Sequence, residues 1–412
     1  MASVLRFGSS SRLELDLPAE LLLAELPEPR AASLADPATV TARSLAEPLD
    51  FPPLRQAVVP GDHVVLAVDA TLSQPAAVLT PVVETLAAAG VAPRDVTLLR
   101  TAGENGGGPA LRSALPSDWS AAVDEIVHDP HARGELSYLA STASGERIYL
   151  NRRLCDADLV VPIAAARDAR RDDYFGGLAQ LYPAFSDAAT QHRFRSIALG
   201  DIQGATNPQA RRRAREEADE VGWLLGVAFS LEVVPGPGDA ILDVVSGTPA
   251  AVEQQAAARF AQAWSHPIDR RARLVVATIS GPPVQQTWES VGRALSAALQ
   301  VVAEGGAIAL CTEIDHEPGP AVRHLAVSEH RPTALREIAR QRLPDALIAA
   351  QLARALDRAQ IYLLSRLDEE TVEQIELVPL EGADQLERLA QRHGSCIVVP
   401  SAQHAVPRPG GR

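Results

Sequence analysis

The chain has 412 residues, of which 52 are acidic and 38 are lysine or arginine, so its net charge is −14. This acidic balance argues against nucleic acid or an anionic membrane as a partner. The sequence contains no lysine, which excludes Schiff-base chemistry on a lysine, a cofactor tethered through its amine, and a phosphate loop of the G-x-x-x-x-G-K-[ST] type.

The first elements along the chain are a hairpin and an extended arm. The run VLRFGSSSRLELD (residues 4–16) alternates apolar and polar residues around a Gly-Ser-Ser turn, which predicts a β-hairpin. Residues 17–53 are rich in Pro, Ala and Leu, and we expect an extended arm with a short helix near Ala19–Leu26.

A βαβ unit follows the arm. HVVLAVD (63–69) predicts a buried strand that ends in an acid, residues 78–86 have helical spacing, and DVTLLR (95–100) predicts the next strand. Because parallel strands end at the same edge of a sheet, we expect Asp69 and the 101–108 loop to share the edge where open α/β sheets bind ligands.

The strand–helix alternation then continues and restarts. DLVVPI (158–163) predicts a further strand, and Asn207-Pro208 marks the start of a charged helix. After a boundary at 264–272, four strand-like runs alternate with helical segments; they are RLVVATI (273–279), AIALC (307–311), IYLLS (361–365) and CIVVP (396–400).

These patterns predict an α/β fold with two domains, each with a largely parallel sheet and flanking helices. We expect domains at 1–265 and 272–400, a flexible tail at 401–412, and a ligand cleft between the domains. The second domain has the rhythm of a Rossmann-like or flavodoxin-like fold. The N-terminus has no secretory signal pattern, and no apolar run approaches the roughly 20 residues that span a bilayer, so we expect a cytoplasmic protein.

Several motifs, taken in order, resemble the lactate racemase (LarA-like) family over most of the chain. They are VDATLSQP (68–75), TAGENGGG (101–108), LASTASGERIYLN (139–151), YFGGLAQLYPAFSDAAT (174–190), NPQARRRAREEA (207–218) and GPPVQQTWESVGRAL (281–295). The resemblance implies racemisation or epimerisation of a 2-hydroxy acid, in which a nickel-pincer nucleotide accepts and returns a hydride. It further implies a lysine tether, a histidine on the nickel and two acid/base histidines.

The cofactor and acid/base positions of the resemblance fall on other residue types here. The tethering lysine falls on Ala179, just after the cofactor-binding Gly176 and Gly177. One acid/base histidine falls on Asn105, and the other falls near Ala169, in a stretch without histidine. We therefore expect no covalently bound cofactor, and the sequence argues against use of the nickel-pincer nucleotide.

The metal position is also changed. The histidine that ligates nickel in the family aligns with Arg195, and His192, three residues earlier, is the one weak metal candidate nearby.

The substrate positions are partly retained. Asp69 is unchanged and is kept as a catalytic candidate beside Asn105. The arginine of the family's T-R-P motif becomes Leu72, and the carboxylate-binding glutamine and lysine become Ser290 and Arg293.

Three further clusters carry candidate chemistry. HDPH (128–131) and Asp315-His316-Glu317 lie in loops, where a capping or solvated role competes with a metal or catalytic role. Arg170, with Arg167 and Arg171, forms a basic cluster suited to bidentate pairing with a carboxylate or phosphate.

The sequence leaves three functions open. They are a 2-hydroxy acid isomerase of the family type, a non-catalytic protein that binds a small carboxylate or phosphate in the same cleft, and a repurposed enzyme that uses Asp69, Asn105 and the arginine cluster. Loss of the tether and of the acid/base histidines favours a degenerate family member. The oligomeric state is left open.

Overall fold

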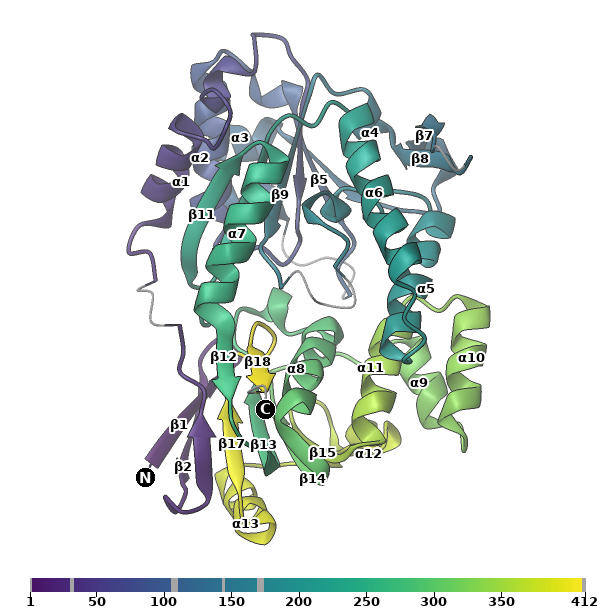
Figure 1. The fold of residues 1–412 in the computed structure, drawn as a ribbon. Helices are drawn as coiled ribbons and strands as arrows, with labels where there is room; N and C mark the ends of the chain where they lie inside the picture. The colour runs from purple at the N-terminus through teal and green to yellow at the C-terminus, as the bar shows by residue number, and fades with distance from the viewer. Residues whose placement is uncertain (1, 30–32, 105–109, 143–144, 169–173, 410–412) are drawn as a thin grey trace.

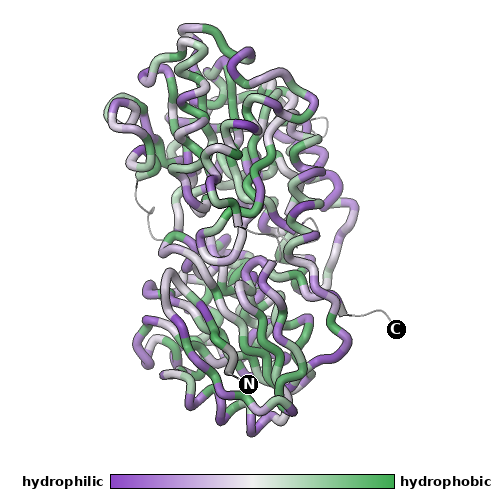
Figure 2. Tube along the Cα trace, turned by 90° about the vertical axis from the view of Figure 1, so that its left-hand side faces the viewer, coloured by the Kyte–Doolittle hydropathy of each residue, from purple (hydrophilic) through white to green (hydrophobic). Residues whose placement is uncertain are grey.

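The computed structural model describes residues 2–29, 33–104, 110–142, 145–168 and 174–409. Two α/β units lie one above the other, and the long helix α7 (Pro249–Trp264) leads from the upper unit to the lower one (Figure 1). Hydrophobic segments run through the middle of both units and hydrophilic segments lie outside (Figure 2). The predicted two-domain α/β fold is confirmed.

The upper unit is built on a six-stranded sheet in the order β11-β10-β9-β4-β5-β6. Strands β10 to β6 run parallel, and β11 is antiparallel to β10. The strands are β4 (Val64–Val68), β5 (Val96–Thr101), β6 (Asp124–His128), β9 (Leu159–Ala165), β10 (Ser230–Pro235) and β11 (Ile241–Gly247). Every residue of β4 is buried, as parallel strands covered on both faces require.

Helices cover both faces of this sheet. One face packs against α1 (Pro37–Ala46), α2 (Pro75–Ala88) and α3 (Ser117–Ala122). The other packs against α4 (Arg152–Cys155), α5 (Ala188–Ile202), α6 (Pro208–Leu224) and the hairpin of β7 (Leu136–Ser141) and β8 (Arg147–Asn151). Helix α6 begins where predicted, because the Asn207 side chain accepts a hydrogen bond from Ala210 N at 3.0 Å.

The lower unit has a parallel six-stranded sheet in the order β16-β15-β14-β13-β17-β3. The strands are β3 (Leu22–Glu25), β13 (Ala272–Thr278), β14 (Val302–Cys311), β15 (Ala359–Leu364), β16 (Val378–Pro379) and β17 (Cys396–Val399). The helices are α8 (Trp288–Val301), α9 (Pro320–Ala326), α10 (Arg331–Gln341), α11 (Ala346–Leu356), α12 (Glu369–Gln374) and α13 (Ala383–His393).

The start of the chain belongs to the lower unit, which differs from the predicted 1–265 domain. The predicted hairpin is present as β1 (Ala2–Phe7) and β2 (Ser11–Asp16), and it packs on the lower sheet. The helix expected near Ala19–Leu26 is wrong, because β3 occupies that segment. The exposed backbone of β17 supplies the partners that favour a strand there, and Leu26 N donates to Val398 O at 2.9 Å.

The end of the chain differs from the predicted flexible tail at 401–412. Ser401, Ala402 and Gln403 are buried, and β18 (Val406–Pro409) pairs in parallel with β12 (Ser265–Ile268). Apolar burial and this strand pairing hold the tail through residue 409, and residues 410–412 lie outside the described part of the chain.

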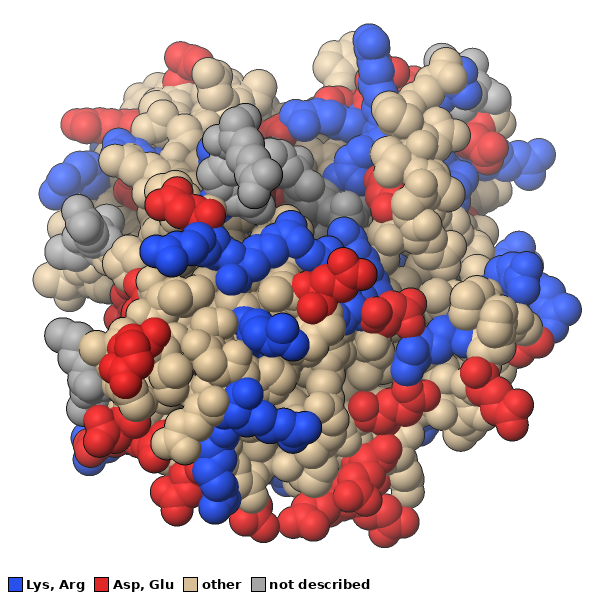
Figure 3. Space-filling view, turned by 60° about the horizontal axis from the view of Figure 1, so that its bottom comes forward, with Lys and Arg blue, Asp and Glu red and all other residues tan. Residues whose placement is uncertain are grey.

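The surface carries its positive charge entirely as arginine. Because the chain has no lysine, every blue side chain in Figure 3 is an arginine, and on the face shown a band of them runs between acidic side chains. None of the described helices combines the length and the apolar character needed to cross a membrane.

Candidate functional site

A cavity of about 740 Å³ lies between the two units. Residues at the carboxyl ends of β4, β5 and β9 line one wall, and the start of α8 and the loop after β14 line the other. The predicted cleft between the domains is therefore present. Asp69 and residues 101–104 line it together, which confirms the predicted shared edge for the described part of that loop.

Asp69 follows β4 directly and forms a part-buried ion pair with Arg167. Its Oδ2 accepts from Arg167 Nη2 at 3.0 Å, and its Oδ1 accepts from the backbone N and the Oγ1 of Thr71, both at 2.8 Å. Burial alone would raise the pKa of Asp69, but the charge of Arg167 and the hydrogen bonds from Thr71 outweigh burial and lower it. Asp69 is thus an ionised anchor for Arg167.

Glu104, three residues after β5, reaches across the cleft to the lower unit. Its Oε2 accepts a hydrogen bond from Trp288 N at 2.6 Å, and its Oε1 accepts one from Glu289 N at 2.8 Å. Both donors belong to the first turn of α8, where unpaired N–H groups and the helix dipole favour an anion. The sequence analysis placed this loop correctly but did not single out Glu104, although an acid at a strand's carboxyl edge is a usable signal.

Two more contacts join the units around Glu104. The ring Nε2 of His316 lies 3.4 Å from Glu104 Oε2. Gln285 Nε2 donates to Thr71 O at 3.1 Å and to Ser73 Oγ at 3.0 Å. The Asp315-His316-Glu317 cluster therefore contributes His316 to the cleft.

A second compartment of about 280 Å³ adjoins the cavity and shares Arg167, Ala179 and Glu289 with it. Arg195 from α5 and Arg293 from α8 line this compartment.

The two arginines of this compartment differ in their partners. Arg293 Nη2 donates to Ser290 Oγ at 2.8 Å, and its Nη1 lies 3.6 Å from Glu289 Oε2. Arg195 Nη1 donates to Pro344 O at 3.0 Å, and its Nη2 donates to Gln191 Oε1 at 3.4 Å. Within the described residues, no carboxylate forms an ion pair with Arg195. Burial lowers its pKa, and Glu289 and Asp345 offset this only in part.

The glycine-rich segment forms a tight turn against the cavity. Gly176 has φ = 105°, a conformation that favours glycine. Gly177 faces two acids, since a β-carbon there would lie 3.2 Å from Glu232 Oε1 and 3.3 Å from Glu253 Cβ. Ala179 follows in the same turn and presents a methyl group to both compartments.

Glu232 is a buried acid within the apolar strand β10, 8% exposed. Burial and the neighbouring Glu253 raise its pKa to about 7, and Arg167 partly opposes the rise. Glu253 itself accepts from Tyr174 Oη at 2.9 Å and from Arg215 Nη2 at 2.6 Å. The sequence analysis missed Glu232, although a single acid in the run SLEVVP (230–235) was a visible signal.

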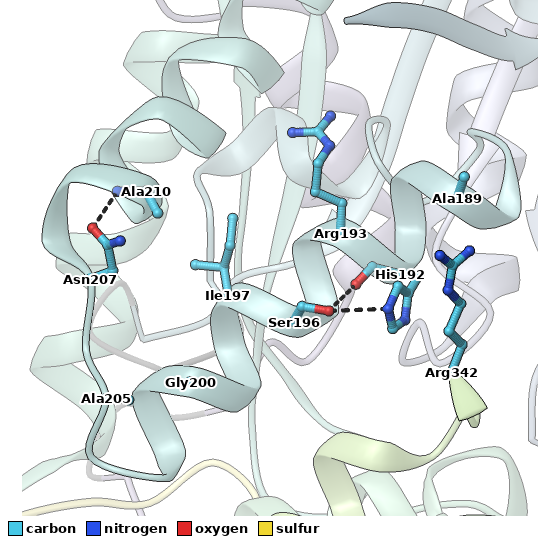
Figure 4. Close-up of a pocket in the computed structure, with 10 residues that line it drawn as sticks. All are labelled: Ala189, His192, Arg193, Ser196, Ile197, Gly200, Ala205, Asn207, Ala210 and Arg342. Carbon is cyan, nitrogen blue, oxygen red and sulfur yellow. Dashed lines mark hydrogen bonds between the residues drawn. The ribbon is translucent and has the colours of Figure 1, made fainter. Parts of the chain in front are cut away.

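The remaining sequence candidates are placed as follows. Leu72 is 2% exposed and packs in the core of the upper unit, away from the cavity lining. Ser290 supports Arg293. His192 lies on α5 outside the cleft, with its ring 3.3 Å from Ser196 Oγ (Figure 4). Asn105 and Arg170 lie outside the described residues.

Metal ligands do not converge on the predicted positions. Among the described residues, no three His, Cys, Asp or Glu side chains come together as a metal site would require. In the HDPH segment, His128 is buried, and its Nε2 lies 2.9 Å from Ser186 O while its Nδ1 lies 3.3 Å from Asn151 Nδ2. That histidine has a structural role.

Part of the chain matches a known protein family. Residues 7–192 match the family described as the lactate racemase N-terminal domain. This matched part of the chain belongs to the lactate racemase-like family. The order of its motifs predicted this.

Two solved structures resemble this lactate racemase-like chain. The lactate racemase apoprotein from Thermoanaerobacterium thermosaccharolyticum is 17% identical over 99% of this chain and 100% of that chain, with a TM-score of 0.78. A crystal structure of a protein from Thermotoga maritima is 16% identical over 91% of this chain and 99% of that chain, with a TM-score of 0.66. At these identities the likeness concerns the fold. A search of curated proteins found no significant match.

The nickel-pincer nucleotide does not fit the residues at its implied positions. Ala179 offers a methyl group where a tether is needed. Arg195, at the position of the nickel ligand, carries a guanidinium that stays protonated and has no lone pair for a metal.

Proposed function

We propose that the protein binds a small carboxylate in the cleft between its two units and does not perform the hydride-transfer racemisation of its family. The observation that carries the proposal is the pair Arg195 and Arg293, which come from different units and line one compartment. Arginine suits this role because its planar fork matches both oxygens of a carboxylate.

The electrostatics of Arg195 favour an anionic ligand. Arg195 is half-buried, and no ion pair joins it to a carboxylate among the described residues. Its guanidinium therefore carries a desolvation cost that a bound carboxylate would offset. The lowered pKa of Arg195, caused first by burial, is consistent with that cost. Arg293 has Glu289 nearby, so Arg195 is expected to gain more from the ligand.

The rest of the compartment suits a short apolar body on the ligand. Phe175 and Phe194 pack edge to face with ring centroids 5.2 Å apart, and Leu347 and Ile348 line the opposite side. A volume of about 280 Å³ admits a small organic acid rather than a long chain. The ligand class is therefore a small carboxylate with an apolar substituent.

The groups needed for inversion of a 2-hydroxy acid are replaced. A base must take the hydroxyl proton as hydride leaves the same carbon. Asp69 is held ionised against Arg167, with a lowered pKa, and is a weak base. Arg195 cannot accept a proton at all.

Calorimetric titration with paired ligands tests the proposal. Lactate, mandelate and 2-hydroxyisovalerate would each be compared with the corresponding uncharged amide. We expect at least one carboxylate to bind and its amide to bind about tenfold or more weakly. Arg323→Gln, an exposed arginine outside both compartments, is the control and should bind as the wild type does. Failure of all the carboxylates would overturn the proposal.

A separate measurement addresses the family chemistry. The protein would be expressed together with the enzymes that make the family cofactor, and its metal and nucleotide content measured. We expect neither nickel nor bound nucleotide, and no inversion of either lactate enantiomer. Stoichiometric nickel with inversion would show family catalysis by another route.

A second candidate is an enzyme of different chemistry in the same cleft. It rests on Glu232, whose pKa of about 7 suits proton exchange near neutral pH and which lies behind the Gly176-Gly177 turn that borders the cavity. Turnover of a bound carboxylate that disappears in Glu232→Gln while binding persists would support it. Binding without turnover would favour the first candidate.

A further inference from the structure

A second groove lies beside the start of α5 and adjoins the smaller compartment of the cleft. It has a volume of about 850 Å³ and lies between the segment from Pro130 to Leu136, the start of α5 and the loop after α10. Three arginines, Arg133, Arg195 and Arg342, line it together with two histidines, His131 and His192. Most of its lining differs from that of the carboxylate compartment, although Gln191, Arg195 and Pro344 border both.

The charge of this groove is not balanced locally. Asp187 is the one acid in its lining, and its Oδ1 already accepts a hydrogen bond from Thr190 N at 2.7 Å as the N-cap of α5. No ion pair joins Arg133 or Arg342 to a carboxylate in the part of the chain that the structure describes. Such a cationic groove is unusual on a chain with a net charge of −14.

Arg342 and His192 lie side by side in the neighbouring pocket drawn in Figure 4, and both also line the groove. Arg342 is the C-cap of α10 and has φ = 58°, a left-handed conformation in which glycine is the usual residue. The pKa of His192 is lowered, first by burial and then by the charges of Arg342 and Arg195. Those charges create a positive potential at the ring.

A neighbouring arginine shows the contrast. Arg193 points away from His192 (Figure 4), and its guanidinium binds both carboxylate oxygens of Glu217. Its charge is therefore neutralised, whereas Arg133 and Arg342 remain available to an external anion.

The lining also offers a surface for an organic group. Tyr149 and Leu136 come from the β7–β8 hairpin, and Pro130 and Pro344 lie at the two sides. Tyr149 stacks edge to face on Tyr138 with ring centroids 5.8 Å apart. An aromatic ring beside arginines is a combination that binds a phosphate attached to a planar or apolar body.

We propose that this groove is a second binding site, specific for a small phosphorylated organic molecule held by Arg133 and Arg342 against Tyr149. The groove is large enough for a ligand of nucleotide size. Because Arg195 borders both sites, an anion in the groove weakens carboxylate binding in the cleft, and the reverse holds by linkage.

Calorimetric titration with AMP, adenosine and inorganic phosphate tests the site. We expect AMP to bind the full chain and adenosine to bind about tenfold or more weakly, because adenosine lacks the phosphate. Arg133→Glu/Arg342→Glu should weaken AMP binding by about a hundredfold. Arg336→Glu makes one such Arg-to-Glu substitution at an exposed position of α10 and should leave AMP binding unchanged.

Two outcomes would overturn the proposal. One is that AMP fails to bind, including the case in which a glutamate-rich peptide binds instead. The other is that AMP binds equally to the wild type and to Arg133→Glu/Arg342→Glu. Arg293→Gln separates this site from the cleft, because it should lower carboxylate affinity while AMP affinity is retained.

Discussion

The carboxyl edges of the two sheets differ in how their polar groups are used. At the upper edge, Asp69, Glu104 and Arg167 line an open cavity, and Glu104 finds its hydrogen-bond donors on α8 of the other unit. These groups face ligand space or the domain interface.

At the lower edge the polar groups are buried and bonded to one another. Thr312 Oγ1 donates to Gln286 Oε1 at 2.8 Å, and Gln403 Nε2 donates to Ser280 O at 2.6 Å. The same architecture therefore places cavity-lining polar groups at one edge and mutually bonded, buried polar groups at the other. The lower unit contributes to the cleft through the start of α8 and the loop after β14, and to the adjoining compartment through Arg293.

The largest expected effect concerns the lower edge, where the polar groups are buried and bonded to one another. Gln286→Ala leaves Thr312 Oγ1, Glu313 N and Gly281 O without a shared partner. We expect the free energy of unfolding to fall by about 4 kcal/mol. Because Gln286 does not line the cavity, carboxylate affinity of the folded protein should be retained. Urea unfolding measures the free energy of unfolding, and calorimetry measures the carboxylate affinity. The substitution Gln360→Ala at an exposed position is the control. A Gln286→Ala variant with lower carboxylate affinity and an unchanged free energy of unfolding would contradict this difference between the two edges.

The next effect concerns Glu232, a buried acid on strand β10 of the upper sheet. Glu232 has its pKa raised from 4.5 to about 7 in the folded protein, so the folded state binds the proton more tightly than the unfolded state. Stability contributed by this group is present at low pH and is lost as pH rises through that window. Between about pH 5 and about pH 8 we expect the free energy of unfolding of the wild type to fall by about 3 kcal/mol. In Glu232→Gln this fall should be absent.

Urea unfolding at several pH values provides the comparison. The exposed Glu381→Gln serves as the control and should keep the wild-type slope. Equal slopes for the wild type and Glu232→Gln would show that this acid is not held neutral.

A smaller effect separates the two arginines of the cleft. Arg195→Met removes a half-buried charge that has no ion pair among the described residues. We expect the free energy of unfolding to rise by about 1 kcal/mol while carboxylate affinity falls. Arg293→Met should lower affinity without the gain in stability, since it loses Glu289 and Ser290 as partners. Destabilisation by Arg195→Met would indicate that the charge is compensated within the free protein.

The smallest effect concerns the hydrogen bonds that Glu104 of the upper unit accepts from the first turn of α8 in the lower unit. Glu104→Gln weakens the anionic cap on α8, and we expect a cost of about 1 kcal/mol in thermal unfolding. Asp368→Asn alters a cap of α12 that lies within one unit, where the carboxylate accepts from Thr371 N at 2.8 Å. Only Glu104→Gln should also change carboxylate affinity, and a change in both variants would remove the special role of the interface.

Much of the fold followed from periodicity. The strands at 63–69 and 95–100 and the boundary near 264–272 correspond to β4, β5 and the end of α7. The segment at Leu22–Glu25 could not be predicted, because its strand conformation depends on pairing with β17, which lies far along the chain.

The site was predicted only in part, for a different reason. Motif order located the edge that carries Asp69 and the turn that carries Ala179, since both lie in local sequence patterns. The contact of Glu104 with α8 joins residues 184 positions apart, and the isolation of Arg195 depends on burial. Local residue spacing predicts neither the contact of Glu104 with α8 nor the surroundings of Arg195.

Calorimetric titration of the best-binding carboxylate into the wild type and into Arg195→Gln/Arg293→Gln tests the central claim most directly. The account predicts saturable binding to the wild type and affinity lower by about a hundredfold or more in the folded double variant. Equal affinity of the two proteins would contradict the claim that this arginine pair holds the ligand.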